Sequence, residues 1–176
     1  TQTVAFTADT LTHGHNSSHD DDTVRSFVAQ TPFKGASVID ANGTMRAISV
    51  SNLDGAESEQ LVGQEFSDRT YFQRARAGET YISDPVAADS GNLIVTISAP
   101  VVENGTVVAT FNGALHVRNS SLFRPSSVSL GDDQRLTVRS QEFLLFTGDG
   151  SAGGNGTDAL TGNATVSATG WSIAAA

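Results

Sequence analysis

Five side chains in one short stretch have the chemistry to hold a small molecule. Arg69 can form two parallel hydrogen bonds with a carboxylate, and Tyr71 and Phe72 follow it closely, so flat rings flank the cation. Tyr81 and Asp84 come next, in the sequence Tyr-Ile-Ser-Asp-Pro. These residue types enclose and orient a polar ligand, and they include no nucleophile paired with a base.

Each of these residues also has a purely structural interpretation. Arg69 can pair on the surface with a neighbouring carboxylate, Asp68 or Glu65, while the two rings after it pack in the core. Asp84 precedes a proline, and an Asp-Pro dipeptide commonly does no more than form a turn. The sequence leaves both interpretations open for Arg69, Tyr81 and Asp84.

Two Asn-Gly dipeptides, at residues 42–43 and 104–105, predict two β-hairpins around this stretch. Both central residues of a type I′ turn need a positive φ, which Asn and Gly adopt more readily than other residues. The predicted strands are 36–40 and 44–50, then 92–102 and 106–117.

Two helices alternate with the hairpins. The first is predicted from Asp20-Asp21-Asp22 to the residue before Pro32, and residues 1–19 are expected to be a polar lead-in. The second is predicted to start at Ser67 or Asp68 and to stop at Gly78. This order predicts an α+β fold with a five-stranded antiparallel sheet, PAS-like in outline, in which Tyr81 lies on a short strand.

The second hairpin is expected to line the ligand, but its register is open. Either Thr96 and Ser98 or Ile97 and Ala99 face the ligand, because a shift of one residue exchanges the two faces of a strand. His116, near the end of the same hairpin, is either a polar group of the site or part of the packing.

Three sequence blocks carry a resemblance to a known family: SDRTYF at 67–72, YISDP at 81–85 and TISAP at 96–100. In this order and spacing they resemble the membrane-distal lobe of double Cache (PDC, PAS-like) sensor domains. Those domains are the extracytoplasmic input modules of histidine kinases and chemoreceptors in two-component and chemotaxis signal transduction. The resemblance implies a ligand-binding lobe, with an N-terminal helix, in residues 1–117 and a smaller, reduced second lobe in 118–176.

The resemblance also implies roles for particular residues. The family carries its anchoring Arg and aromatic residues in the segment that matches Arg69, Tyr71 and Phe72. Members that bind α-amino acids have an Asp where this chain has Ala114. The expected ligand is therefore a small carboxylate or another compact polar metabolite.

Composition excludes several other functions. There are 19 acidic and 10 basic residues, giving a net charge of −9, and such a surface disfavours nucleic acids and anionic membranes. Lys34 is the only lysine, and an acidic, Lys-poor surface resembles proteins of extreme halophiles. Cysteine is absent. The histidines and acidic residues at 13–22 suit a metal by type, but their spacing fixes no geometry, so we expect no metal and no cofactor.

The chain is expected to be the ectodomain of a membrane receptor. It has no run of about 18 apolar residues, no initiator Met and no signal peptide, so it is interpreted as part of a longer protein with flanking transmembrane helices. A homodimer of the intact receptor is expected through an N-terminal helix. Sequons for N-glycosylation begin at Asn16, Asn42, Asn104, Asn119, Asn155 and Asn163.

Two other function classes stay open. The polar composition, the sequons and the Gly-rich segment 148–156 also suit a secreted or surface adhesion module without a small ligand. A hydrolase of esterase type would need a serine within reach of His116. The sequence has no G-x-S-x-G or H-E-x-x-H motif, so we expect the domain to be non-catalytic.

Overall fold

The protein is described by a computed structural model that covers residues 2–11, 17–51, 58–87, 93–117, 135–140, 144–149, 162–166 and 171–175. The chain forms two compact units. The first combines Thr1–Ser83 with Val95–His116, and the second combines Asp84–Ile94 with Val117–Ala176. The division into lobes of 1–117 and 118–176 stays a prediction, and the structure adds residues 84–94 to the C-terminal unit.

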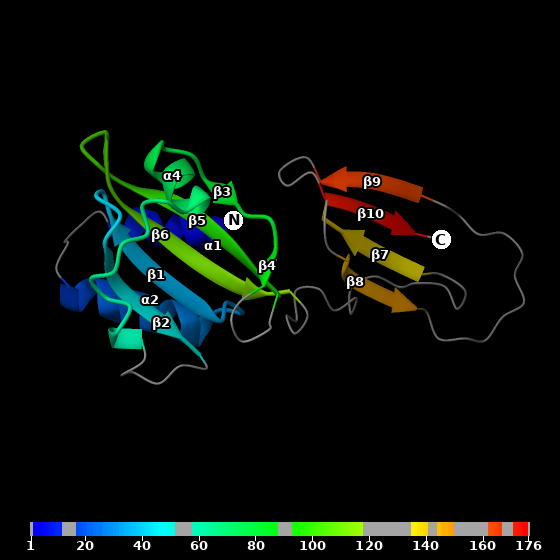
Figure 1. Ribbon diagram of the computed structural model, residues 1–176, viewed down its shortest axis with the longest axis horizontal. Coiled ribbons are helices and arrows are strands. Elements are labelled where there is room, and N and C mark those ends of the chain that lie inside the picture. The colour runs from blue at the N-terminus through cyan, green and yellow to red at the C-terminus, as the bar shows by residue number, and fades with distance from the viewer. Residues whose placement is uncertain are drawn as a thin grey trace, which may run out of the picture. The chain divides into compact units, whose positions relative to one another are not determined.

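An antiparallel sheet with the strand order β2-β1-β6-β5-β3 forms the centre of the first unit (Figure 1). A further two-residue strand, β4, pairs with the beginning of β5. The predicted α+β fold with a five-stranded antiparallel sheet is confirmed. The strands are β1 (Gly35–Asp40), β2 (Met45–Val50), β3 (Tyr81–Ile82), β4 (Val86–Ala87), β5 (Leu93–Glu103) and β6 (Thr106–His116).

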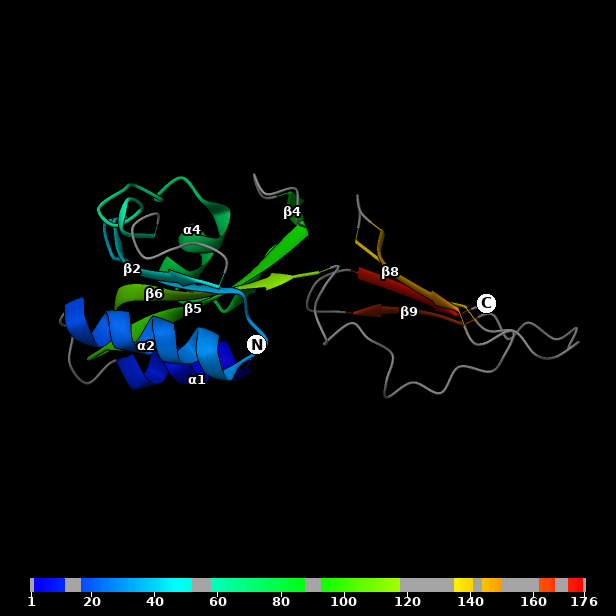
Figure 2. The ribbon, with the colours of Figure 1, turned by 90° about the horizontal axis from the view of Figure 1, so that it is seen from below.

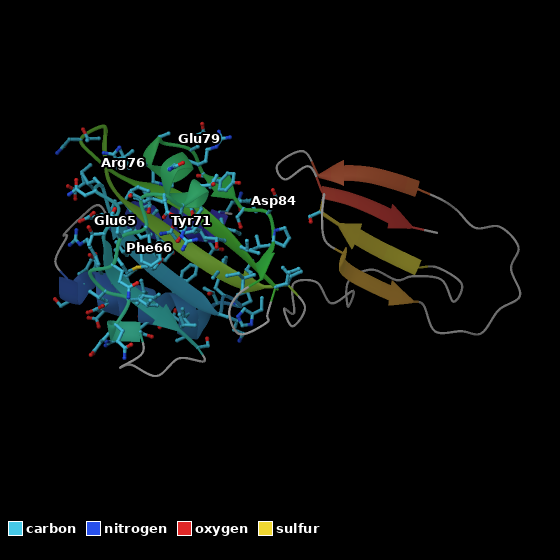
Figure 3. All side chains as sticks on the ribbon, in the orientation of Figure 1. Glu65, Phe66, Tyr71, Arg76, Glu79 and Asp84 are labelled. Carbon is cyan, nitrogen blue, oxygen red and sulfur yellow. The ribbon has the colours of Figure 1, made fainter. Side chains whose placement is uncertain are left out.

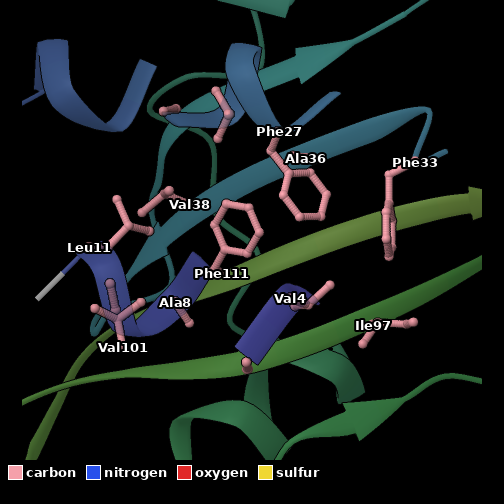
Figure 4. Close-up of a cluster of buried hydrophobic side chains, with 14 of the residues drawn as sticks. Val4, Ala8, Leu11, Phe27, Phe33, Ala36, Val38, Ile97, Val101 and Phe111 are labelled. Atoms are coloured by element: carbon pink, nitrogen blue, oxygen red, sulfur yellow. The ribbon is translucent and has the colours of Figure 1, made fainter. Parts of the chain in front are cut away.

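Helices cover both faces of this sheet. Helices α1 (Gln2–Thr10) and α2 (Ser17–Gln30) lie on one face, and α4 (Thr70–Arg76) lies on the other (Figure 2). The main apolar core fills the space between the sheet and the helix pair (Figure 4). The Phe27 ring is at its centre, with centroids 4.8 Å from Phe33 and 5.0 Å from Phe111.

Helix α1 overturns the expectation of a polar lead-in over residues 1–19. Val4, Ala8 and Leu11 follow a helical spacing and are at most 1% exposed in the main core. The helix packs against β6, and a helix of this length depends on such tertiary packing for its stability.

Helix α2 also starts before the predicted position, at Ser17. Asp20 therefore lies inside its first turn, where its side chain is completely buried. Its Oδ2 is 3.1 Å from Nη2 of Arg46 on β2. The acidic run thus supplies an ion pair between helix and sheet as well as a favourable charge at the helix N-terminus.

Both predicted hairpins are confirmed, with different turns. Asn104 and Gly105 have φ values of 49° and 79°, as a type I′ turn requires. In the first turn Gly43 has φ 98°, whereas Asn42 is not left-handed. There the Asp40 carboxylate organises the turn, because its Oδ1 accepts hydrogen bonds from the backbone N–H groups of Asn42 and Thr44.

The second unit contains a four-stranded antiparallel sheet in the order β8-β7-β10-β9. The strands are β7 (Arg135–Arg139), β8 (Leu144–Asp149), β9 (Gly162–Val166) and β10 (Trp171–Ala175). The part of the Gly-rich segment that follows residue 149 lies outside the described residues. Within the described ranges, no helix is long and apolar enough to cross a membrane.

Candidate ligand-binding site

The register of β5 answers the question that the sequence left open. Ile97 and Ala99 lie in the main core with Phe27 and therefore face α1 and α2. Successive side chains on a strand alternate between faces, so Thr96 and Ser98 lie on the opposite face, the one that α4 covers.

The same alternation applies to β6 and β1. Phe111 packs on Phe27, so Thr110 and Asn112 face α4. Ser37 lies directly across from Asn112 and shares that face. The α4 face of the sheet therefore carries a set of hydroxyl and amide side chains, which we call the polar layer: Ser37, Thr96, Ser98, Thr110 and Asn112.

Hydrogen bonding within the polar layer is incomplete. Asn112 Nδ2 lies 3.3 Å from Thr110 Oγ1 and 3.4 Å from Ser37 Oγ. Asn112 Oδ1 and Ser98 Oγ are buried and have no partner among the described residues. Leaving a buried polar atom unpaired costs about 1–3 kcal/mol, so such atoms call for an explanation. A ligand with a donor for Asn112 Oδ1 is one that fits this face.

Tyr81 borders the polar layer at the sheet edge, directly across from Ser98. The β3 edge is fixed by Ser83, whose N–H donates to Thr96 O and whose Oγ accepts from Thr96 N–H. The guanidinium carbon of Arg74 lies 5.9 Å from the Tyr81 ring centroid. Arg74 was not singled out from the sequence. The one feature of the sequence that pointed to it is its position one helical turn after Thr70 and Tyr71.

Helix α4 places Tyr71 and Phe72 against the same face of the sheet. Phe72 is 2% exposed and packs with Ile39 and Met45. Tyr71 and Phe66 pack on this cluster from the rim, and Figure 3 labels both beside α4. Burial raises the pKa of the Tyr71 phenol, while Arg69 lowers it and Asp68 raises it by smaller amounts.

Helix α4 begins later than the predicted start at Ser67 or Asp68, so Arg69 lies before the helix. The helix begins at Thr70, and Arg69 is its extended N-cap residue with φ −76° and ψ 128°. Its N–H donates to Phe66 O, which closes a turn before the helix. The side chain is 58% exposed, and its Nε lies 3.6 Å from Asp68 Oδ1. A ligand role for Arg69 stays a prediction.

Asp84 and His116 are less defined as site residues. Asp84 is exposed and belongs to the second unit, whereas the other predicted site residues belong to the first. His116 is half-buried at the end of β6, on the same face as Asn112 by alternation. Their ligand roles stay predictions.

A separate hollow of about 470 Å³ lies between α4 and the β1–β2 turn. Phe72 is the one predicted site residue on its wall. Arg76, also on the wall, donates from Nε to Ala41 O at 2.5 Å and forms no ion pair with a described residue. Elsewhere in the described ranges, no three His, Asp or Glu side chains come together as metal ligands.

The fold is the one that Cache/PAS-like domains have, and it matches solved structures of extracellular ligand-binding domains. An extracellular ligand-binding receptor from Desulfohalobium retbaense superposes with a TM-score of 0.65 at 14% identity, over 99% of this chain and 36% of that one. The chain thus spans about a third of that receptor's length. No family model and no curated protein matches the sequence.

Two further solved structures have the same fold. The ligand-binding domain of the Pseudomonas aeruginosa amino acid chemoreceptor PctC in complex with GABA gives a TM-score of 0.64 at 13% identity, over 99% of this chain and 88% of that one. The sensor domain of the V. cholerae histidine kinase DctB gives 0.55 at 16% identity, over 83% and 58%.

Proposed function

We propose that the chain is the extracytoplasmic ligand-sensing domain of a transmembrane receptor, a histidine kinase or a chemoreceptor. The observation that carries this proposal is the polar layer, in which four of the five hydroxyl and amide residues are buried and two buried atoms, Ser98 Oγ and Asn112 Oδ1, are unpaired. Its place in a fold that chemoreceptor and kinase sensor domains share supports the proposal further.

The ligand that suits this face best is a small polar metabolite with a carboxylate. The polar layer is uncharged, so a cation for the carboxylate has to come from the α4 segment. Arg69 is the N-cap residue of α4, whereas Arg74 on the helix already pairs with Glu79 at 3.1 Å. The Arg69–Asp68 pair is exposed on both sides, and such pairs contribute only about 0–1 kcal/mol. Arg69 can therefore exchange Asp68 for a ligand carboxylate at little cost.

The domain would bind its ligand without transforming it. The ligand would bind one of two receptor conformations more tightly and so favour it. The resulting conformational change would pass through the flanking transmembrane helices of a homodimer. The acidic surface with a single lysine favours a halophilic source. The halophilic source predicts that thermal stability, measured by circular dichroism, falls when the protein is transferred from molar to 0.1 M salt.

The test of the site is a thermal-shift screen of carboxylates, amino acids, amines and sugars. A ligand at 100 times its dissociation constant adds about 2.7 kcal/mol to the free energy of unfolding, which is a clear shift. We expect Ser98→Val and Arg69→Ala to abolish the shift. Arg76→Ala, in the hollow beside the β1–β2 turn, is the matched control and should keep it.

Each outcome separates the candidates. A shift lost only in Arg76→Ala would move the site to the hollow that Arg76 lines. Hits restricted to amines or sugars, which carry no carboxylate, would contradict the ligand class. No hit across the library would favour the alternative, an adhesion module without a small ligand.

A further inference from the structure

The sequon Asn104-Gly105-Thr106 occupies the tip of the hairpin that joins β5 and β6, and all three of its residues are exposed. The Asn104 amide has no hydrogen-bond partner among the described residues. The neighbouring Val102 on β5 is also exposed, at 40%, so the tip is open to solvent. The amide nitrogen is therefore free for modification from solvent.

Sequons are more frequent in this chain than its composition explains. Six of its nine asparagines are followed by Ser or Thr two residues later. Since 39 of the 176 residues are Ser or Thr, chance predicts about two such cases. The type I′ turn accounts for Asn104 and Gly105, but it requires nothing of Thr106.

Exposure separates the asparagines in the same way. Asn112 is 3% exposed and is not in a sequon. Asn42 and Asn104 are exposed, and both are in sequons. Among the asparagines whose side chains the structure describes, the two in sequons are exposed and the one outside a sequon is buried.

We propose that Asn104 is a site of N-linked glycosylation. Asn104 Nδ2 forms a bond to the anomeric carbon of a sugar carried by a lipid phosphate donor, and the proton that Nδ2 loses passes to solvent. The bond from that carbon to the phosphate oxygen breaks, and the lipid phosphate leaves with the electron pair. This inference rests on the extracytoplasmic location in the proposed function.

The Asn42 sequon is less accessible to a transferase than the Asn104 sequon. Gly43 is buried, and Thr44 is half-buried with its N–H bonded to Asp40 Oδ1 and its C=O bonded to Asp40 N–H. Drawing this sequon into an enzyme would break the turn. If transfer follows folding, Asn104 should carry more glycan than Asn42.

The chain's trypsin sites allow both asparagines to be measured separately. The peptide 77–118 contains Asn104 as its only sequon, and the peptide 35–46 contains Asn42 as its only one. We expect mass spectrometry of the full-length protein from its own cells to find glycan on most copies of peptide 77–118. Intact glycopeptide mass is the readout, because Asn-Gly pairs deamidate spontaneously.

Thr106→Val removes the sequon hydroxyl and preserves the turn, so it should abolish the glycan. Thr80→Val changes an exposed threonine of the same peptide outside any sequon, so it should leave the glycan in place. A wild-type peptide 77–118 that is wholly unmodified overturns the inference. In that case, protease added to intact cells tests the proposed extracytoplasmic location separately. If the protease cleaves the ectodomain and no glycan is found, only the glycosylation is overturned and the location stands.

Discussion

Ser98 and Tyr81 face each other across β5 and β3, so a completely buried hydroxyl lies beside a half-buried phenol. Ser98 Oγ has no hydrogen-bond partner within the described ranges. An unpaired buried hydroxyl lowers the stability of the ligand-free fold by about 1–3 kcal/mol. A ligand that supplies a hydrogen-bond partner for Ser98 Oγ removes this cost. Binding next to Ser98 and Tyr81 therefore raises the stability of the folded domain.

Replacement of Ser98 by alanine should therefore stabilise the ligand-free domain, by up to about 1–3 kcal/mol, since the unpaired hydroxyl is lost. The same variant should bind ligand more weakly. Urea unfolding with and without ligand measures both effects, and Ser49→Ala on β2 is a control outside the polar layer. A variant less stable than the wild type would mean that Ser98 Oγ has a partner in solution.

Phe72→Ala should destabilise the first unit by about 3–5 kcal/mol, because Phe72 is 2% exposed in the cluster that holds α4 on the sheet. The matched control is Phe6→Ala on α1, where the ring is 71% exposed. That change should stay within about 0.5 kcal/mol. Chemical denaturation of both variants checks the difference, and equal losses would contradict the packing of α4 described above.

Gly43→Ala and Gly105→Ala separate backbone strain from steric overlap. Both glycines have positive φ, at 98° and 79°, which costs a side chain about 1–2 kcal/mol. A Cβ at Gly43 would also lie 2.5 Å from Ser67 Cβ, whereas a Cβ at Gly105 meets nothing within 4 Å. Gly43→Ala should therefore be clearly the more destabilising in thermal melts. Similar losses in the two variants would show that the first turn yields to the added methyl group.

The raised pKa of Tyr71 predicts a loss of stability in alkali. Its folded pKa lies above the unfolded value of about 10, chiefly because burial disfavours the phenolate. This contribution to stability is complete below pH 10 and is lost as the pH rises through the folded pKa. Urea unfolding between pH 8 and 11.5 should show a smaller decline for Tyr71→Phe than for the wild type. Parallel curves would argue against burial of the phenol.

The sequence by itself determined the local elements of this fold. The Asn-Gly pair at 104–105 specified a type I′ hairpin, because few other residues adopt both positive φ values. Helix α4 was predicted from its pattern and its terminal glycine, and the short strand at Tyr81 from its place before the hairpin. These features depend on backbone preferences of residues that are close together in the chain.

Only the tertiary structure decided what depends on distant partners. Helix α1 forms because Val4 meets β6, more than a hundred residues away in the chain. The register of β5 could not be predicted from alternation, because residues on both of its faces, such as Ser98 and Ala99, are buried. The pairing of Asp20 with Arg46, and the unpaired atoms of the polar layer, likewise arise only when helix and sheet come together.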